Sequence, residues 1–334
     1  RPSQGACRFA LPCASSSPSE GEPGGRPKPR KSSEVRVVIE PLRMKGRKVR
    51  LAVMALGKLG SRETTATSDL DLVIIYDFDQ DKPESDGRRS LHAVQYYTRL
   101  TQRLISALTV STRRGTLYDV DMRLRPSGKK GPVAVQLSSF VQYQREEAET
   151  WEKMAISRAR PICGDATLLD DLQAAIATSL SERRDARMLA RDIREMRELI
   201  AREKGDADRA DLKLYRGGLV DVEFIAQFLV LAHAVDHNDL LVAGTSDILR
   251  RAASAGLLAP SDAETLLAAH RLYTDVVQMQ RILLPLDMKP DAAPPAVRRR
   301  IATSAGLPDE KQLNAEIADR AKNIAAMFKR LLAG

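Results

Sequence analysis

The sequence is poor in the residues that build thiolate metal sites and catalytic histidine sites. Of its 334 residues, three are cysteines and four are histidines. Cys7, Cys13 and Cys163 form no Cys-x-x-Cys pair, and the histidines are scattered over sequence with a helical pattern. This composition disfavours a zinc site and a Cys/His nucleophile. We expect the histidines, including His233 and His237 four residues apart, to be ordinary surface or core residues.

Long apolar runs are also missing. No stretch of about 18 apolar residues is present, so we expect no transmembrane helix. The first residues lack the charged start and apolar block of a signal peptide. Apolar residues make up 43% and charged residues 29% of the chain, as in ordinary globular proteins. We therefore expect a cytoplasmic protein with no membrane partner.

An excess of positive charge is present but unevenly placed. Lys and Arg number 53 against 44 Asp and Glu, a net charge of +9. Most of this excess falls in residues 1–50, so the remainder is nearly neutral, and we expect no nucleic-acid partner. Residues 1–35 are rich in Ser, Pro and Gly, and we predict that they form a disordered leader.

The length predicts two domains. Hydrophobic patterns predict an α+β fold, in which a mixed sheet with helices over residues 36–137 precedes an all-α bundle over residues 138–334. The expected strands cover residues 51–56, 69–76, 116–124 and 132–137, with a helix starting near residue 90. The expected later helices cover residues 138–160, 168–204 (one or two helices), 219–234, 246–255, 261–284 and 314–332.

Two carboxylates stand at the start of the second expected strand. Because alternate side chains of a strand share a face, Asp69 and Asp71 project together, whereas Leu70 and Leu72 point into a core. Neighbouring carboxylates repel unless a cation lies between them, and rigid oxygen ligands suit Mg²⁺. An Asp-x-Asp pair is also common in solvated turns, so the pair alone leaves both interpretations open.

A glycine-containing loop precedes these acids. Gly57, Gly60 and Ser61 follow the first expected strand, and their backbone N–H groups allow a phosphate to come close. A third acid, Asp121, lies on the strand over residues 116–124; Asp119 shares its face, so selecting Asp121 is a choice. Together these features predict a phosphate–metal site.

Several further residues have a functional and a structural interpretation. Arginines near a strand end bind phosphates or form structural ion pairs. The same two interpretations apply to a lysine in the loop and to two arginines at the end of the helix expected over residues 138–160; the residues concerned are Lys58, Arg123, Arg125, Arg158 and Arg160. We expect Asp221 and Glu223 to complement a helix dipole rather than bind metal. We expect Trp151 to lie in the core.

Five short motifs carry a family resemblance. They are residues 55–63 (Ala-Leu-Gly-Lys-Leu-Gly-Ser-Arg-Glu), 68–72 (Ser-Asp-Leu-Asp-Leu), 118–128, 157–161 (Ser-Arg-Ala-Arg-Pro) and 217–224 (Gly-Gly-Leu-Val-Asp-Val-Glu-Phe). In this order they resemble glutamine synthetase adenylyltransferase, within the polymerase-beta-type nucleotidyltransferase superfamily. The resemblance runs from about residue 51 to the end.

This resemblance implies a nucleotidyltransferase catalytic domain over residues 36–137 and a mechanism. The chain would transfer AMP from ATP to a tyrosine of glutamine synthetase, releasing pyrophosphate and lowering nitrogen assimilation. Two Mg²⁺ ions would be held by Asp69, Asp71 and Asp121, and Asp121 would accept the tyrosine proton. The expected phosphate-binding residues are Gly60, Ser61, Lys58, Arg123 and Arg125.

Full-length members of the family resemble two catalytic halves in tandem, one adding AMP and the other removing it by phosphorolysis. The Gly-Lys-Leu-Gly and Asp-Leu-Asp signature occurs once here, in a form more like the C-terminal, adenylylating half. The family also implies a nitrogen-signalling regulatory protein as a partner of the full-length enzyme. Two alternatives remain open: the phosphorolytic, deadenylylating reaction, and a catalytically silent module that binds glutamine synthetase.

Overall fold

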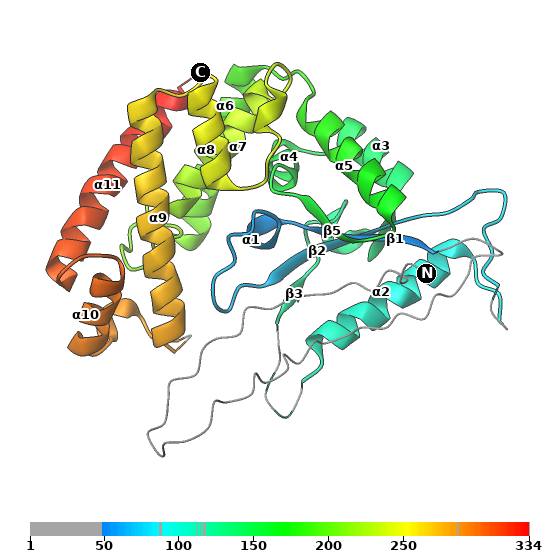
Figure 1. Cartoon of the computed structure of the whole chain (residues 1–334), viewed down its shortest axis with the longest axis horizontal. Coiled ribbons are helices and arrows are strands. Elements are labelled where there is room, and N and C mark those ends of the chain that lie inside the picture. Colours follow the sequence, from blue (N-terminus) through cyan, green and yellow to red (C-terminus); the bar gives the residue numbers. More distant parts are fainter. Residues whose placement is uncertain are drawn as a thin grey trace, which may run out of the picture.

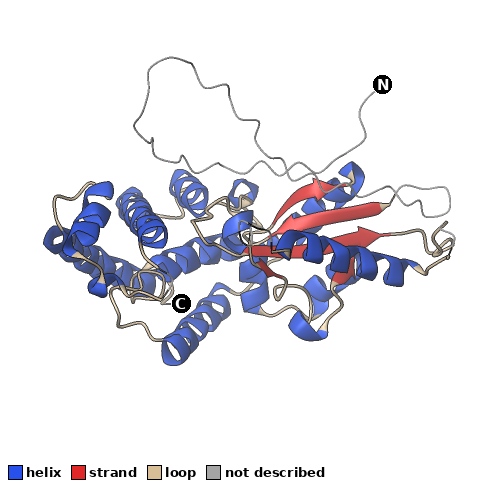
Figure 2. Cartoon of the chain, turned by 90° about the horizontal axis from the view of Figure 1, so that it is seen from below, coloured by secondary structure: helices blue, strands red, loops and turns tan. Residues whose placement is uncertain are grey.

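A computed structural model describes residues 49–86, 89–111, 113, 115, 118–285 and 287–333 of the chain. The predicted leader over residues 1–35 lies outside these ranges. A sheet flanked by helices lies beside an all-helical part (Figures 1 and 2). This architecture confirms the expected α+β class.

The sheet is organised around its second strand. Its five strands are β1 (Arg50–Ala55), β2 (Leu70–Asp77), β3 (Val120–Asp121), β4 (Ala134–Gln136) and β5 (Arg160–Gly164). The order is β3-β2-β1-β5, and β4 also pairs with β2. Strand β1 runs antiparallel to β2 and β5, whereas β3 and β4 run parallel to β2. The short β3 therefore lies opposite the start of β2, where the acidic residues are.

Both faces of the sheet are buried, which explains why β1 and β2 read as continuous apolar runs. Helix α2 (Ala93–Thr109) covers one face, and α3 (Leu137–Glu146) and α5 (Ala166–Leu180) cover the other (Figure 1). Alternate residues of the strands enter the two cores. Ala52, Met54, Val73 and Ile75 face α3 and α5, whereas Val53, Ala55, Leu72, Ile74 and Tyr76 face α2.

The predicted single helix over residues 138–160 is wrong. Helix α3 ends at Glu146, and α4 (Thr150–Ile156) begins with a capping box in which Glu149 and Glu152 exchange hydrogen bonds with each other's backbone N–H groups. Pro161 cannot continue a helix, and its segment pairs with β1 as β5. The sheet therefore continues beyond residue 137, the predicted end of the catalytic domain.

The helical part begins after α5. Its helices are α6 (Ala186–Lys204), α7 (Leu219–His233), α8 (Thr245–Ser254), α9 (Pro260–Leu283), α10 (Pro295–Ser304) and α11 (Glu310–Leu331). Short 3₁₀ turns occur at η1 (Gly128–Lys130), η2 (Asn238–Leu240) and η3 (Pro290–Ala292). The helices predicted from residues 219, 246, 261 and 314 are confirmed to within about one turn. Helix α10 was not predicted; Pro295 occupies its first turn, where proline is favoured.

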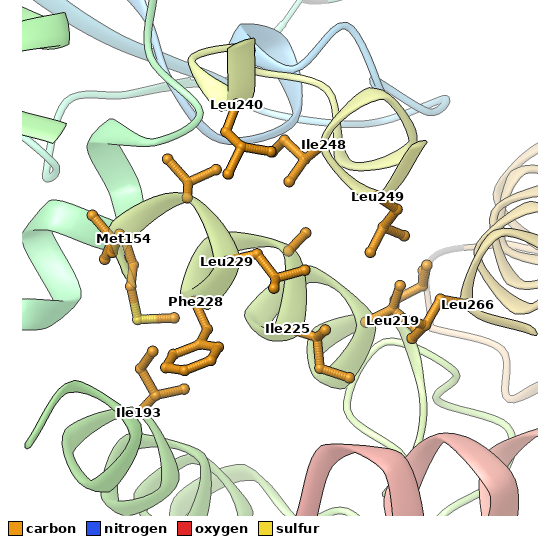
Figure 3. Close-up of a cluster of buried hydrophobic side chains, with 14 of the residues drawn as sticks. Met154, Ile193, Leu219, Ile225, Phe228, Leu229, Leu240, Ile248, Leu249 and Leu266 are labelled. Carbon is orange, nitrogen blue, oxygen red and sulfur yellow. The ribbon is translucent and has the colours of Figure 1, made fainter. Parts of the chain in front are cut away.

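Helix α7 lies at the centre of the helical part (Figure 3). Its Ile225, Phe228 and Leu229 are buried among side chains from α4, α6, α8 and α9. The same apolar cluster extends from one face of the sheet to α11, so the two parts share one hydrophobic core. Trp151 does not belong to it: this residue is 41% exposed, which corrects the expected core position.

None of the helices in the described ranges combines the length and the apolar character needed to cross a lipid bilayer.

Candidate active site

Two of the predicted acids face each other across neighbouring strands. In the parallel pairing of β2 with β3, Asp71 lies opposite Asp121 and Leu70 opposite Val120. The Leu70 N–H donates to the carbonyl oxygen of Asp119 at 2.8 Å, which fixes this register. Paired strands lie about 4.8 Å apart, so the two carboxylates are neighbours. Asp119 is exposed and uses its backbone for this bond.

The surroundings of the Asp71 carboxyl group disfavour its ionised form. Partial burial, followed by the charges of Asp121 and Asp69, raises the pKa of Asp71 to about 6. The positive charges of Arg158 and Lys213 oppose this shift without overcoming it. A carboxylate whose ionisation is penalised by neighbouring acids is a place where a cation is stabilised.

Asp121 has a partner of its own. The backbone N–H of Arg123 donates to Asp121 Oδ1 at 2.8 Å, and the Arg123 guanidinium contacts both carboxylate oxygens. These bonds lower the pKa of Asp121 despite some burial. The Arg123 side chain is 66% exposed, so little packing opposes its movement away from the carboxylate.

The acids fit a cation of the Mg²⁺ type. Asp69, Asp71 and Asp121 offer hard oxygen donors, and repulsion on Asp71 is the feature that a cation would relieve. Among the described residues, no three acidic, histidine or cysteine side chains enclose a cation by themselves. Mg²⁺ commonly completes its coordination shell with water and phosphate oxygens, so these acids would supply only part of that shell.

The predicted glycine loop contains one helical turn, α1 (Gly57–Gly60), that packs tightly against its surroundings. Gly57 has φ +50°, and a Cβ there would lie 2.3 Å from Asp71 Oδ2, so only glycine lets this carboxylate approach the turn. A Cβ at Gly60 would lie 1.9 Å from the carbonyl oxygen of Arg158. Glycine at both positions thus lets α1 pack closely against Asp71 and Arg158. Turn α1 therefore lies beside the acidic edge, which we define as Asp69, Asp71 and Asp121.

The amide groups expected to bind phosphate are already used. Gly60 N–H donates to Leu56 O at 2.8 Å, and Ser61 N–H donates to Gly57 O at 3.2 Å. The Ser61 hydroxyl donates to Gly57 O and accepts from Arg158 Nη2 at 2.8 Å. In this conformation, the predicted contact between these amides and a phosphate is not available.

The remaining predicted phosphate ligands differ in whether their side chains already have hydrogen-bond partners. Lys58 is partly buried, which lowers its pKa, and its ammonium has no hydrogen-bond partner within the described residues. Arg125 donates to the carbonyl oxygens of Met122 and Gly131, and so stabilises the turn after β3. Arg160 donates to Gly60 O at 2.9 Å and to Leu59 O at 3.1 Å. Lys58 therefore has no hydrogen bond in the part of the chain that the structure describes, although its charge interacts with that of Glu223, whereas these two arginines have structural partners.

A second ionic cluster, the Arg158 junction, lies next to the acidic edge. We define it as Arg158, Glu63, Glu223 and Thr245. Arg158 contacts Glu63 Oε2 at 2.9 Å and Glu223 Oε2 at 2.8 Å. Glu223 thus pairs with Arg158, and Asp221 pairs with the buried Arg197. Asp221 lies in the first turn of α7, where it was expected to complement the helix dipole, whereas Glu223 lies beyond that turn.

Sequence reasoning finds only half of this junction. It names Arg158 and Glu223 as candidates but not Glu63 or Thr245. The Thr245 N–H donates to Glu63 Oε1 at 2.8 Å across 182 residues of sequence. Only the glutamate inside the 55–63 motif offered a signal.

Comparison with known families gives two matches in succession along the chain. The family model described as glutamate-ammonia ligase adenylyltransferase matches residues 31–175. The model described as PII-uridylyltransferase matches residues 187–332, which contain the helical part.

Several curated relatives carry the name bifunctional glutamine synthetase adenylyltransferase/adenylyl-removing enzyme. The protein from Rhodopseudomonas palustris is 48% identical over 292 residues, which cover 87% of this chain and 29% of the relative. The protein from Xanthobacter autotrophicus is 49% identical over 282 residues, covering 84% and 28% respectively. For Bradyrhizobium diazoefficiens the identity is 45% over 292 residues, covering 87% and 29%. The chain thus spans less than a third of the length of these relatives, and it belongs to the glutamate-ammonia ligase adenylyltransferase family.

Proposed function

We propose that this chain transfers AMP from ATP to a tyrosine hydroxyl of glutamine synthetase and releases pyrophosphate. The observation that carries the proposal is the pairing of Asp71 with Asp121, with Asp69 two residues away and turn α1 alongside. The name shared by the relatives supports the choice of glutamine synthetase as the acceptor.

In this proposal, the acids bind the metal ion, and one of them also accepts a proton. Mg²⁺ held by Asp69, Asp71 and Asp121 would supply positive charge to the phosphates and acidify the attacking hydroxyl. The tyrosine oxygen bonds to the α-phosphorus while the bond from that phosphorus to the pyrophosphate oxygen breaks. Asp121 is our proposed acceptor for the tyrosine proton, which requires Arg123 to share or leave its carboxylate.

The phosphates of ATP need donors that are not already engaged. Lys58 and the exposed Arg123 are our proposed ligands for the β- and γ-phosphates. Gly60 and Ser61 shape the turn that carries Lys58, and Arg125 supports the turn after β3. Positioning and charge, rather than a covalent intermediate, account for the chemistry.

The reverse reaction is the second candidate. The relatives' name includes adenylyl removal, and the same acids could bind inorganic phosphate for attack on a tyrosine-linked AMP, giving ADP. Nucleotide choice is also open to test, because the model matching the helical part is named for uridylyl transfer. The predicted likeness to the adenylylating half favours AMP transfer.

A labelling assay distinguishes these activities. The chain is incubated with Mg²⁺, glutamine synthetase and either ATP or UTP labelled at the α-phosphate. We expect label on the synthetase from ATP, its loss in Asp71→Asn and Asp121→Asn, and its retention in the matched control Asp119→Asn. Release of ADP from modified synthetase by phosphate, without forward labelling, would favour the reverse reaction. Binding without either reaction would identify a silent docking module.

A further inference from the structure

The loop between α1 and β2, residues 61–69, leads directly into the acidic edge and is anchored to the helical part near its beginning. Arg158 Nη2 binds Ser61 Oγ at 2.8 Å and Glu63 Oε2 at 2.9 Å. From the start of α8, the Thr245 N–H donates to Glu63 Oε1 at 2.8 Å and the Thr245 hydroxyl to Glu63 Oε2 at 3.1 Å. Glu63 therefore joins this loop to α8 through both carboxylate oxygens.

The far end of the loop is anchored to helix α9. Arg281 Nη1 donates to Thr65 Oγ1 at 2.9 Å, to Ala66 O at 3.2 Å and to Ser68 Oγ at 3.2 Å. The Ala66 N–H donates to Gln278 Oε1 at 2.9 Å. Both ends of the segment preceding Asp69 are thus bonded to helices that lie far away in sequence.

The backbone of this loop is strained. Arg62 has φ 63° and Thr67 has φ 59°, a left-handed conformation that costs energy for side chains with a Cβ, most of all for a β-branched residue. Such conformations persist only where surrounding contacts determine them. The contacts from α8 and α9 supply that constraint.

The charged groups of the junction are largely buried, and its two carboxylates share the Arg158 guanidinium. The side chains of Arg158, Glu63 and Glu223 are 8%, 15% and 12% exposed. Burial by itself would raise the pKa of Glu223, but the charges of Arg158 and Lys58 outweigh it and hold that pKa below its ordinary value. Removing one partner from such a set leaves an unpaired buried charge, which is strongly unfavourable.

We propose that Glu63 is a positioning residue for nucleotidyl transfer: by joining Arg158 to the start of α8, it holds residues 61–69 in the conformation that aims Asp69 and Asp71 at the bound cation. This inference rests on the proposed function, because it assigns Glu63 to the support of the same acids. Both carboxylate oxygens of Glu63 already accept hydrogen bonds from Arg158 and Thr245, so its proposed role is to position other residues. The helical part thereby contributes to the geometry of a site whose acids all lie on the sheet.

The first test measures the loop itself and needs no activity. Glu63→Gln keeps the size of the side chain and removes its charge. We expect backbone amides in residues 61–69 to exchange with deuterium about tenfold faster in this variant, because loss of the ionic anchor at Glu63 lets the segment open more often. Opening exposes the amides of Thr65, Ala66 and Ser68, which otherwise donate to Ser68 Oγ, Gln278 Oε1 and Thr65 O. The matched control is Glu182→Gln, which weakens the pair with the buried Lys153 away from this loop; its loop should exchange as in the wild type. If Glu63→Gln fails to fold, Thr245→Val, which removes one hydroxyl bond, gives the same measurement with a smaller effect.

The second test links the loop to the cation. We expect the Mn²⁺ dissociation constant, measured by electron paramagnetic resonance, to rise about tenfold in Glu63→Gln and kcat to fall, while KM for glutamine synthetase stays constant. Unchanged loop exchange would overturn the positioning role. Faster exchange with wild-type Mn²⁺ affinity and kcat would also overturn it, since Glu63 would then only stabilise the fold. If the wild-type chain binds no Mn²⁺, the proposed function fails and the positioning role fails with it, although the exchange data still report the anchoring.

Discussion

The acidic edge and the Arg158 junction lie next to each other, and they shift the pKa values of their carboxyl groups in opposite directions. At the edge, burial and two neighbouring acids raise the pKa of Asp71 to about 6. At the junction, Arg158 and Lys58 overcome burial and hold the pKa of Glu223 below its ordinary value. A carboxylate left without sufficient countercharge is a candidate ligand site, whereas one held by a cation is a candidate support. The comparison therefore distinguishes the acids that we propose bind a cation from the ion pair that we propose holds them in place.

Breaking the junction should have the largest effect on stability. Arg158→Met leaves Glu63 and Glu223 buried without their cation, and we expect a loss of about 3–5 kcal/mol in the free energy of unfolding. Denaturant unfolding measures this loss. The matched control is Arg183→Met, which breaks an exposed pair with Asp236 and should change stability by less than about 0.5 kcal/mol. An equally small loss for Arg158→Met would contradict the assignment of this residue as a support.

Removing the repelled charge of Asp71 should raise the free energy of unfolding, whereas breaking the junction should lower it. In metal-free buffer containing a chelator, Asp71→Asn removes a repelled charge, and we expect a gain of about 2 kcal/mol at neutral pH. Because the pKa of Asp71 is raised in the folded chain, the wild type keeps this stability below about pH 4 and loses it as the pH rises through about 6. The advantage of the variant should therefore be absent at pH 4 and complete above pH 7. Thermal unfolding across this range measures it, and a variant less stable than the wild type at pH 7 would argue against repulsion at the edge.

Removing the arginine that contacts Asp121 should have a smaller effect, which we expect on Mn²⁺ affinity. Arg123→Ala removes an exposed guanidinium from the Asp121 carboxylate, so Mn²⁺ affinity in the absence of nucleotide should rise by about threefold. Titration of Mn²⁺ into the nucleotide-free chain measures the change. If the affinity falls instead, Arg123 supports the cation site and does not compete with it.

Trp151 should show the smallest effect. Its side chain is 41% exposed, and its indole N–H donates to Glu149 Oε2 at 2.8 Å. We expect Trp151→Phe to change the free energy of unfolding by no more than about 0.5 kcal/mol. A loss of several kcal/mol would place this residue in the core after all.

Hydrophobic patterns in the sequence predicted the strands and helices that such patterns determine. The apolar runs of residues 51–56 and 69–76 predicted strands β1 and β2, with the acids at the start of β2, and the pattern of residues 219–234 predicted helix α7. The break at residues 147–149 and strand β5 were missed because capping and pairing with β1, rather than periodicity, determine them.

The junction could not be predicted for a related reason. Glu63 meets Thr245, and Thr65 meets Arg281, across sequence separations of 182 and 216 residues. Contacts of this kind leave no periodic signal in the chain. The site was therefore predictable in its acids but not in the helices that hold the loop before them.

Cation binding tests the central claim most directly. Mn²⁺ is titrated into the chain with a non-hydrolysable ATP analogue, and bound metal is followed by electron paramagnetic resonance. We predict that the wild type and Asp119→Asn bind Mn²⁺ together with the analogue, whereas Asp71→Asn binds it at least tenfold more weakly. Equal Mn²⁺ affinity in the wild type and Asp71→Asn would contradict a metal-dependent nucleotidyl-transfer site at this edge.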